Sequence, residues 1–418
     1  MERRIEKHQI NRSHKLFNFC NEITFKSKNL YNAVLYRLKQ KYKNDEDFSV
    51  AHSTLYKKYK NLDEFKDMGS AFANLILKQL SKDYKSFFQS MKSYKKDKSK
   101  FNNPPRPPSY KVAGEKGRFQ AAWQANLRKD NTVKVPKHDI YIDFIQNTDK
   151  KIKQIQIEPS DNEYHRNIYF NLKVIYEKEL PEPKEKKGNI AGIDLGKGNL
   201  ATVVTNTKEK PITINGKPLC SMGDYYLKKR KKLMKNVGGR GKSNRMKKLD
   251  QKFKNKQKNY IHNASRKIVD WCNKNDIDTI IIGKNDNWKQ EINIGKQQNY
   301  HFTIIPYNML IEQIEYKAEE YGIAVQLTEE SYTSKASFLD NDDIPVYNEE
   351  ENNNYTFSGK RVKRGLYKAE NGTKINADVN GAYNIIRKLY PDKIGNNINN
   401  KDLLHPKKIN IGRWLNEI

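Results

Sequence analysis

Cysteine is scarce in this chain of 418 residues. Only Cys20, Cys220 and Cys272 occur, and they lie far apart in the sequence. A disulfide framework needs cysteines in pairs, and a structural zinc site usually contains a Cys-x-x-Cys motif. The sequence therefore argues against a disulfide scaffold and predicts no bound zinc.

Long apolar runs are also absent. No stretch approaches the roughly 18 residues that a membrane-spanning helix requires. The first residues, Met1 to Lys7, contain no apolar signal core. These two absences predict a cytoplasmic protein without a membrane partner.

Acidic residues are too few to balance the basic ones. The chain has 80 Lys and Arg residues against 49 Asp and Glu residues, a net charge of +31. A polyphosphate partner explains such an excess most simply, because Lys and Arg attract nucleic acid independently of its sequence. We therefore expect a nucleic-acid-binding protein, associated in a bacterial cytosol with the nucleoid.

Hydrophobic patterns divide the chain into regions. Apolar residues recur at helical steps from Leu80 to Met91, and prolines within 104–108 end the helical region. Strand-like alternation runs from Ile168 to Tyr176, and a second strand includes Ile155, with which Ile152 is out of phase. We expect a first strand at 1–10, helices at 11–105, a small β-barrel or sandwich at 106–182, and alternating strands and helices at 189–418.

One apolar strand carries an acid. Residues 189–196 indicate a buried strand containing Asp194, and residues 199–204 indicate a second strand after a glycine-assisted turn. An aspartate in a core strand is costly to desolvate unless a cation meets it, and hard divalent metals bind carboxylates. Asp378 lies in a second such segment. Metal-binding acids in a protein that attracts phosphate suggest a nuclease.

The segment between Lys228 and Lys258 is strongly basic, with fifteen Lys and Arg residues and a single acid, Asp250. Interleaved apolar residues predict two basic helices around the glycine-rich residues 238–241. We interpret them as a phosphate-binding helix pair. The expected nucleic-acid contacts here are Lys228, Lys229, Arg230, Arg240, Lys242 and Arg245.

The rest of the chain alternates between helix and strand. The pattern predicts an amphipathic helix at 260–274, a buried strand at 279–283, a helix after Pro306, a strand ending at 327–330 and a last helix beginning near Asp378. Together with the Asp194 hairpin, this order is the one expected of a ribonuclease H-like fold. Such folds hydrolyse phosphodiesters by converging about three carboxylates on two metal ions.

Four short motifs stand out, at residues 192–196, 331–335, 357–361 with 364–367, and 378–385. They resemble those of the TnpB family, RNA-guided endonucleases of small insertion sequences related to type V CRISPR effectors and to Fanzor proteins. The resemblance implies a helical recognition lobe, a wedge-type β-barrel and a RuvC nuclease domain. It also implies a guide RNA from the end of a mobile element, and cleavage of double-stranded DNA beside a short flanking motif. It adds Lys335, Arg361 and Arg364 as nucleic-acid contacts.

Two departures from the family pattern matter. TnpB proteins commonly insert a four-cysteine zinc ribbon before the last aspartate, whereas the insertion at about 338–372 contains no cysteine. Its acidic residues at 340–343 and 348–354 lack the spacing and central glycine of a calcium loop, so we expect a flexible polar loop. The second departure is Gly283, which stands where many relatives carry the middle carboxylate.

Another acid must therefore complete the site. Glu330 is favoured because it follows a strand expected to neighbour the one ending at Gly283, about 4.8 Å away, and because some relatives carry a relocated glutamate just before the Tyr-Thr-Ser segment. Glu329 is the alternative. The remaining candidates, all expected to be solvated, are Glu291, Glu312 and Glu315.

The sequence thus predicts an RNA-guided DNA endonuclease. Asp194, Glu330 and Asp378 would bind two Mg²⁺ ions, and no side chain need act as general base. Base pairing by the guide would give sequence specificity, and no protein oligomer is expected. Two alternatives remain open: an RNA-guided DNA-binding protein that no longer cuts, and a guide-independent nuclease of the same fold.

Overall fold

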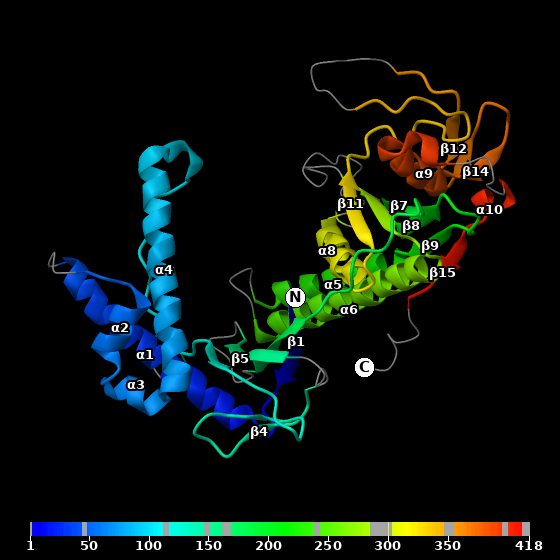
Figure 1. Cartoon of the computed structure of the whole chain (residues 1–418). Coiled ribbons are helices and arrows are strands. Elements are labelled where there is room, and N and C mark those ends of the chain that lie inside the picture. Colours follow the sequence, from blue (N-terminus) through cyan, green and yellow to red (C-terminus); the bar gives the residue numbers. More distant parts are fainter. Residues whose placement is uncertain are drawn as a thin grey trace. The chain divides into compact units, whose positions relative to one another are not determined.

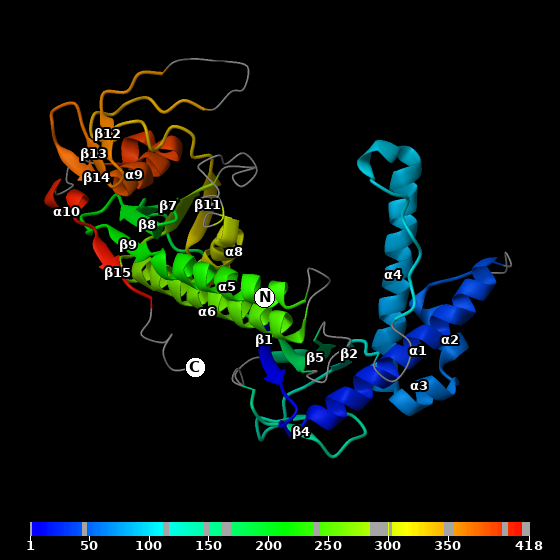
Figure 2. The ribbon, with the colours of Figure 1, turned by 180° about the vertical axis from the view of Figure 1, so that it is seen from behind.

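The computed structural model describes residues 2–43, 48–111, 117–145, 151–160, 169–237, 243–284, 300, 303–346, 355–394 and 400–411. The chain forms two compact units, residues 1–179 and 180–418. Each mixes helices and strands (Figures 1 and 2), which confirms the expected mixed α+β class.

Helices dominate the first half of unit 1, as predicted. Leu80 and Tyr84 are buried against the other helices, whereas the lysines between the apolar positions face solvent. The helical periodicity therefore marks core residues. The helices are α1 (Phe17–Lys43), α2 (His52–Tyr59), α3 (Asp63–Met68), α4 (Ser70–Lys96) and the short 3₁₀ turn η1 (Lys98–Lys100).

The strands of unit 1 form an antiparallel sheet in the order β1-β6-β5-β2. Its register shifts between Ile152 and Gln154, which explains why Ile152 is out of phase with Ile155 although both are buried. Closure of this sheet into a barrel remains an expectation. The strands are β1 (Glu2–Ile10), β2 (Ala121–Gln124), β5 (Lys151–Pro159) and β6 (Phe170–Lys178), with a separate pair of β3 (Val133–Lys134) and β4 (Tyr141–Ile142).

A six-stranded mixed sheet organises unit 2, in the order β11-β10-β7-β8-β9-β15. Strands β7, β8 and β9 are antiparallel neighbours, while β10 and β11 run parallel to β7. Parallel strands covered on both faces are apolar throughout, which accounts for the run at 279–283. The strands are β7 (Ile190–Leu195), β8 (Asn199–Thr205), β9 (Ile212–Asn215), β10 (Thr279–Gly283), β11 (Ala324–Thr328) and β15 (Lys407–Ile409).

Helices cover the two faces of this sheet differently (Figures 1 and 2). Helices α5 (Lys217–Lys235), α6 (Asn244–Lys274) and α8 (Tyr307–Glu319) pack on one face. Helix α9 (Ala377–Leu389) covers the other. A small sheet lies beside α9 and consists of β12 (Lys360–Lys363), β13 (Leu366–Lys368) and β14 (Lys374–Asn376). After α9 the chain continues with η2 (Pro391–Lys393) and α10 (Asn400–Leu404).

Two sequence predictions about unit 2 are wrong. The second basic helix and the amphipathic helix are one continuous helix, α6, because no glycine or proline interrupts residues 244–274 and Ser243 caps the start by accepting from Met246 N. Helix α9, which begins beside Asp378, is also not the last helix, since α10 follows it. The glycine-rich residues 238–241 lie outside the described ranges.

Candidate active site

Asp194 lies near the end of β7, paired across the hairpin with Thr202. Strand β7 is buried except at Asp194, which is partly buried. A Cβ atom added to Gly381 of α9 would lie only 3.2 Å from Asp194 Oδ2. The carboxylate therefore occupies a niche that exists because position 381 has no side chain.

A second glycine brings the helix and the strand together. A Cβ atom at Gly192 would lie 2.4 Å from the backbone oxygen of Ala382 and 2.6 Å from Ile386 Cγ1. Only glycine permits this separation without moving backbone. The close packing places the first turn of α9, and with it Asp378, beside the end of β7.

Asp378 is held at the N-terminus of α9 by neighbours from three elements. Asn376 caps the helix by accepting from the backbone nitrogens of Asp378 and Val379, at 3.0 and 3.2 Å. Asn199 Nδ2, at the start of β8, donates to Asp378 Oδ2 at 2.8 Å. Arg361 of β12 approaches Asp378 Oδ1 at 3.5 Å. Both carboxylate oxygens therefore have a neighbouring donor.

Glu330 follows β11 and reaches across to the end of β10. Gly283 pairs with Thr328 in the parallel register, and a Cβ atom at position 283 would lie 3.0 Å from Glu330 Oε2. The Glu330 carboxylate thus fills the space above the residue whose side chain is missing. Thr333 fixes the turn, because its backbone nitrogen and its hydroxyl both donate to the Glu330 carbonyl.

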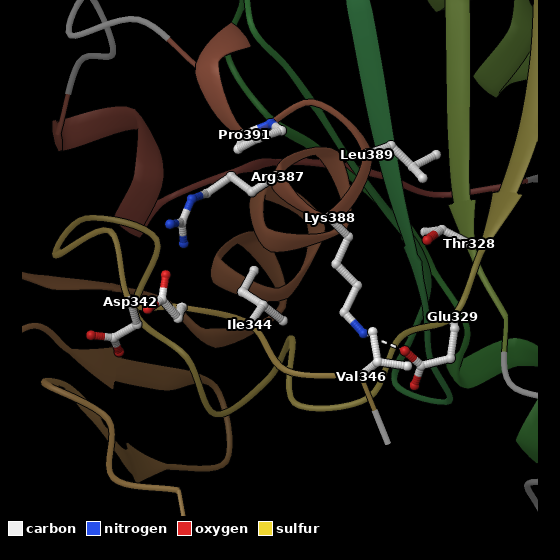
Figure 3. Close-up of a pocket in the computed structure, with 10 residues that line it drawn as sticks. Thr328, Glu329, Asp342, Ile344, Val346, Arg387, Lys388, Leu389 and Pro391 are labelled. Carbon is white, nitrogen blue, oxygen red and sulfur yellow. Dashed lines mark hydrogen bonds and ion pairs between the residues drawn. The ribbon is translucent and has the colours of Figure 1, made fainter. Parts of the chain in front are cut away.

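Glu329 is placed in different surroundings. Its carboxylate forms an ion pair with Lys388 of α9 and accepts from the backbone nitrogen of Ser331 at 2.5 Å. Figure 3 shows this pair within a pocket of about 350 Å³ that is also lined by Asp342 and Arg387. Burial raises the pKa of Glu329, but the ion pair with Lys388 and the hydrogen bonds from Ser331 together outweigh burial and hold this pKa below its ordinary value.

The pKa values of Asp194 and Glu330 shift upward, in the opposite direction to that of Glu329. The pKa of Asp194 is raised well above its ordinary value, first by burial and then by the negative charges of Asp378 and Glu330. Burial and the charge of Glu329 raise the pKa of Glu330 to about 7. A cation would stabilise the ionised form of Asp194, which is partly buried and lies near two other acids.

The donor set is suited in kind to a hard divalent metal. Carboxylate oxygens are the ligands that Mg²⁺ takes, usually together with water and phosphate oxygens. Within the described ranges, however, no group of three or more His, Cys, Asp or Glu side chains is already gathered at ligand spacing. Asp378 would have to exchange Asn199 or Arg361 for a metal. Asp194, Glu330 and Asp378 are therefore suited to Mg²⁺ in their chemistry, while their side chains are not gathered at ligand spacing.

A basic pocket of about 1080 Å³ opens beside Asp378. Arg361 and Arg364, both expected contacts, line it. Lys197, Lys217 and Lys408 line it too, and sequence reasoning did not select them. Lys197 could have been found, since it lies in the turn after Asp194, but Lys408 is brought there by strand pairing far along the chain.

The other expected contacts are scattered. Lys228, Lys229 and Arg245 are exposed on α5 and α6, as is Lys335 after β11. Arg230 is partly buried near Asp250, at 3.9 Å. Outside the described residues lie Arg240, Lys242 and Glu291. Of the rejected candidate acids, Glu312 is exposed and Glu315 partly exposed on α8.

The first acidic cluster of the insertion, residues 340–343, makes specific hydrogen bonds, and its expected flexibility stays a prediction. Asp342 accepts from Ser337 N at 2.7 Å and from the Ser358 hydroxyl at 2.6 Å. Asp340 accepts from the Ser337 hydroxyl and from the backbone nitrogen of Glu370. These carboxylates fix the insertion by hydrogen bonds to backbone and serine groups. Residues 348–354 lie outside the described part of the chain.

Comparison with known proteins supports the same picture. Residues 173–289 match the OrfB_IS605 family model, described as a probable transposase, and residues 307–385 match the Cas12f1-like TNB domain. The TnpB-like protein ORF457 of Acidianus two-tailed virus is 24% identical over 397 residues, covering 87% of this chain and 81% of the viral protein. A cryo-EM structure of a Cas12f1–sgRNA–target DNA complex aligns with a TM-score of 0.53 and 16% identity, covering 89% of this chain and 82% of that one.

Fold and site together define a multidomain α+β protein of Cas12f-like architecture, with a helical N-terminal region and a mixed sheet that carries acids at its edge. The chain is similar to the TnpB family of OrfB_IS605 transposases and to the Cas12f1-like TNB domain, which confirms the resemblance seen in its motifs. The residues that match the TNB domain, 307–385, contain no cysteine. Among the described helices, none is both long and apolar enough to cross a membrane.

Proposed function

We propose that this protein is an RNA-guided DNA endonuclease whose RuvC-like active site consists of Asp194, Glu330 and Asp378. The observation that carries the proposal is the convergence of these acids from β7, the turn after β11 and the start of α9. The three acids lie close enough together for the charges of Asp378 and Glu330 to raise the pKa of Asp194. Strand order in unit 2 agrees with a ribonuclease H-like domain.

The three acids act together in this proposal. Asp194 is the acid whose pKa both other acids raise, and Asp194, Glu330 and Asp378 would together hold the ions. Two Mg²⁺ ions, when bound, would neutralise the charge of the acids, activate water and stabilise the leaving oxygen. Arg361 and the lysines of the basic pocket would hold the phosphates of the DNA strand.

Guide RNA and double-stranded DNA are the proposed partners. The net charge of +31 is suited to two polyphosphates, and the aligned Cas12f1 structure contains an sgRNA and target DNA. A guide transcribed from the end of the mobile element would supply base-pairing specificity, and the protein would read a short flanking motif. Zinc is not part of the proposal.

Plasmid cleavage tests this function. The chain is produced in cells together with DNA flanking its gene, the co-purifying RNA is sequenced, and a plasmid with the matching target is incubated with Mg²⁺ or EDTA. We expect Mg²⁺-dependent cutting that disappears in Asp194→Ala and Glu330→Ala while RNA binding persists. Glu312→Ala, an exposed acid on α8, should cut like the parent. Cutting by Asp194→Ala at the parental rate would exclude the assignment.

A second candidate function is RNA-guided DNA binding without cleavage. It is favoured by Asp378, because both of its carboxylate oxygens already have donors in Asn199 and Arg361. In that case the parent and Asp194→Ala would shift target DNA equally in a gel, and neither would cut it with Mg²⁺.

A further inference from the structure

Three aromatic side chains gather beside the turn that carries Glu330. The ring of Tyr332 lies 5.2 Å from that of Tyr355 at an interplanar angle of 70°, and 6.2 Å from that of Phe357. Tyr355 is 38% exposed, and the other two rings are partly exposed. Exposed apolar patches on a protein surface often mark a binding site.

Backbone geometry holds Tyr332 in this position. Its φ angle of +62° is unusual for a bulky residue and costs free energy, so the surrounding structure must enforce it. Thr333 provides the constraint, donating to the Glu330 carbonyl on one side and accepting from Asn384 Nδ2 of α9 at 2.9 Å on the other. One rigid turn thus directs Glu330 toward Asp194 and carries Tyr332 two residues further on.

The other two rings are held in place as well. Ser358, which follows Phe357, donates from its backbone nitrogen and its hydroxyl to Asp342, the latter at 2.6 Å. A Cβ atom at Gly359 would lie 2.5 Å from the Tyr367 ring, so the strand can approach that buried ring only with glycine there. The segment is therefore fixed at its base while Tyr355 remains exposed.

Cationic side chains accompany the cluster. Lys335 Nζ lies 5.6 Å from the centre of the Tyr332 ring. Strand β12, which begins three residues after Phe357, is exposed along its whole length and carries Lys360 and Lys363, besides Arg361, which approaches Asp378. Asp342, the acid bonded to this segment, is engaged by Ser337 and Ser358. Aromatic faces among cations are the combination that binds single-stranded nucleic acid, since bases stack on rings while Lys and Arg hold the phosphates.

We propose that Tyr332, Tyr355 and Phe357 form a stacking platform for unpaired bases of the nucleic acid strand next to the carboxylate site. This inference rests on the proposed function in one respect: the bound strand would be cut at Asp194, Glu330 and Asp378. Its ligand is an unpaired base, because the stacked bases of a duplex do not offer a free face to a protein ring. Duplex DNA therefore competes for the cations without occupying the platform.

Photocrosslinking locates the bound base directly. The full chain carrying Asp194→Ala is mixed in EDTA with a thymidine oligonucleotide containing one iodouracil, irradiated, digested and analysed by mass spectrometry. We expect adducts on Tyr355 or Phe357. Because no cleavage is needed, the result is independent of whether the enzyme cuts. Adducts confined to α5, α6 or unit 1 would overturn the proposal.

Affinity measurements provide the second test. Tyr355→Leu and Phe357→Leu keep an apolar side chain but remove the ring, and each should weaken binding of the thymidine oligonucleotide about fivefold or more. Tyr355→Phe should bind like the parent. The matched control is Val362→Ser on β12, which removes a 48% exposed apolar side chain without a ring and should change nothing.

An abasic oligonucleotide of the same length separates stacking from charge. It should bind the parent and the leucine variants alike, because it offers phosphates without bases. If the leucine variants lose affinity for both oligonucleotides equally, the rings support a phosphate site and the platform is refuted. Equal affinity of parent and leucine variants for the thymidine oligonucleotide would refute it as well.

Discussion

The Glu330 carboxylate lies over Gly283 at the end of β10, with its Oε2 atom 3.0 Å from the place a Cβ atom would take. The Glu330 carboxylate therefore occupies space that a side chain at position 283 would take. In the proposed site, the absence of a side chain at Gly283 makes room for the carboxylate of Glu330.

Gly283→Ala tests this coupling. We expect DNA cleavage to fall about tenfold to a hundredfold, since a displacement of about 1 Å in a catalytic group costs that much. The new methyl group would also meet Ile385 Cδ1 at 2.6 Å. Adding Ile385→Val removes that atom and should restore the melting temperature but not the cleavage rate. Parental cleavage by Gly283→Ala would show that Glu330 does not act from this position.

Gly192 should be essential for stability, because α9 packs directly on its Cα. Gly192→Ala places a Cβ atom 2.4 Å from the Ala382 carbonyl, and overpacking of this kind typically costs about 1–3 kcal/mol or more. Gly198→Ala in the adjacent turn is the matched control, since no atom lies within 4 Å of its added Cβ. Urea unfolding of both variants measures the difference, and equal midpoints would contradict the close approach.

Asn384 is a buried amide on α9 that stabilises the turn after Glu330. Its Nδ2 atom donates to the carbonyls of Thr333 and Ala336, at 2.9 and 2.7 Å. Asn384→Ala leaves these buried acceptors with fewer donors and should lower the free energy of unfolding by about 1–3 kcal/mol. Asn263→Ala, at an exposed position on α6, should cost less than about 0.5 kcal/mol.

Lys317 predicts a pH dependence of stability. Its ammonium is buried between α6 and α8 and donates to the His262 carbonyl and the Ser265 hydroxyl. Burial, and then the charge of Arg266, lower its pKa from 10.5 to about 8, opposed by Glu320 and Asp270. Between pH 8 and 10.5 the unfolded chain binds more protons at this residue, so stability rises with pH there.

A lysine-to-methionine variant isolates the effect. Across that pH window the parent should gain roughly 3 kcal/mol relative to Lys317→Met, from about 1.4 kcal/mol per pKa unit. Denaturant unfolding at pH 7.5, 9 and 10 measures this gain. Parallel curves for the two proteins would mean that Lys317 titrates at its ordinary pKa.

Local patterns predicted the strands and helices of unit 2 well. The acid in an otherwise apolar strand identified β7, and the strand expected to end at 327–330 does lie beside β10, although β11 already ends at Thr328. The predicted division of α6 is wrong, because the composition changes from basic to amphipathic at Tyr260 while the helix continues. When only one part of a helix packs against a sheet, its composition changes along its length although the helix is continuous.

The surroundings of each acid could not be read from the sequence. Glu329 and Glu330 are adjacent and chemically alike, and only the direction of the turn sends one toward Lys388 and the other toward Gly283. In the same way, Lys408 enters the basic pocket through a pairing of β15 with β9 that no local pattern indicates. Long-range contacts decide both cases.

The topology of the unit 2 sheet also determines when the parts of the candidate site are made during translation. Asn199 meets Asp378 across 179 positions of sequence, and the edge strand β15 is made later still. While the ribosome is synthesising the intervening residues, a nascent chain has its basic helices but neither α9 nor a complete set of acids. Under the proposed function, the basic surface for a guide RNA would be made before the carboxylates that cut DNA.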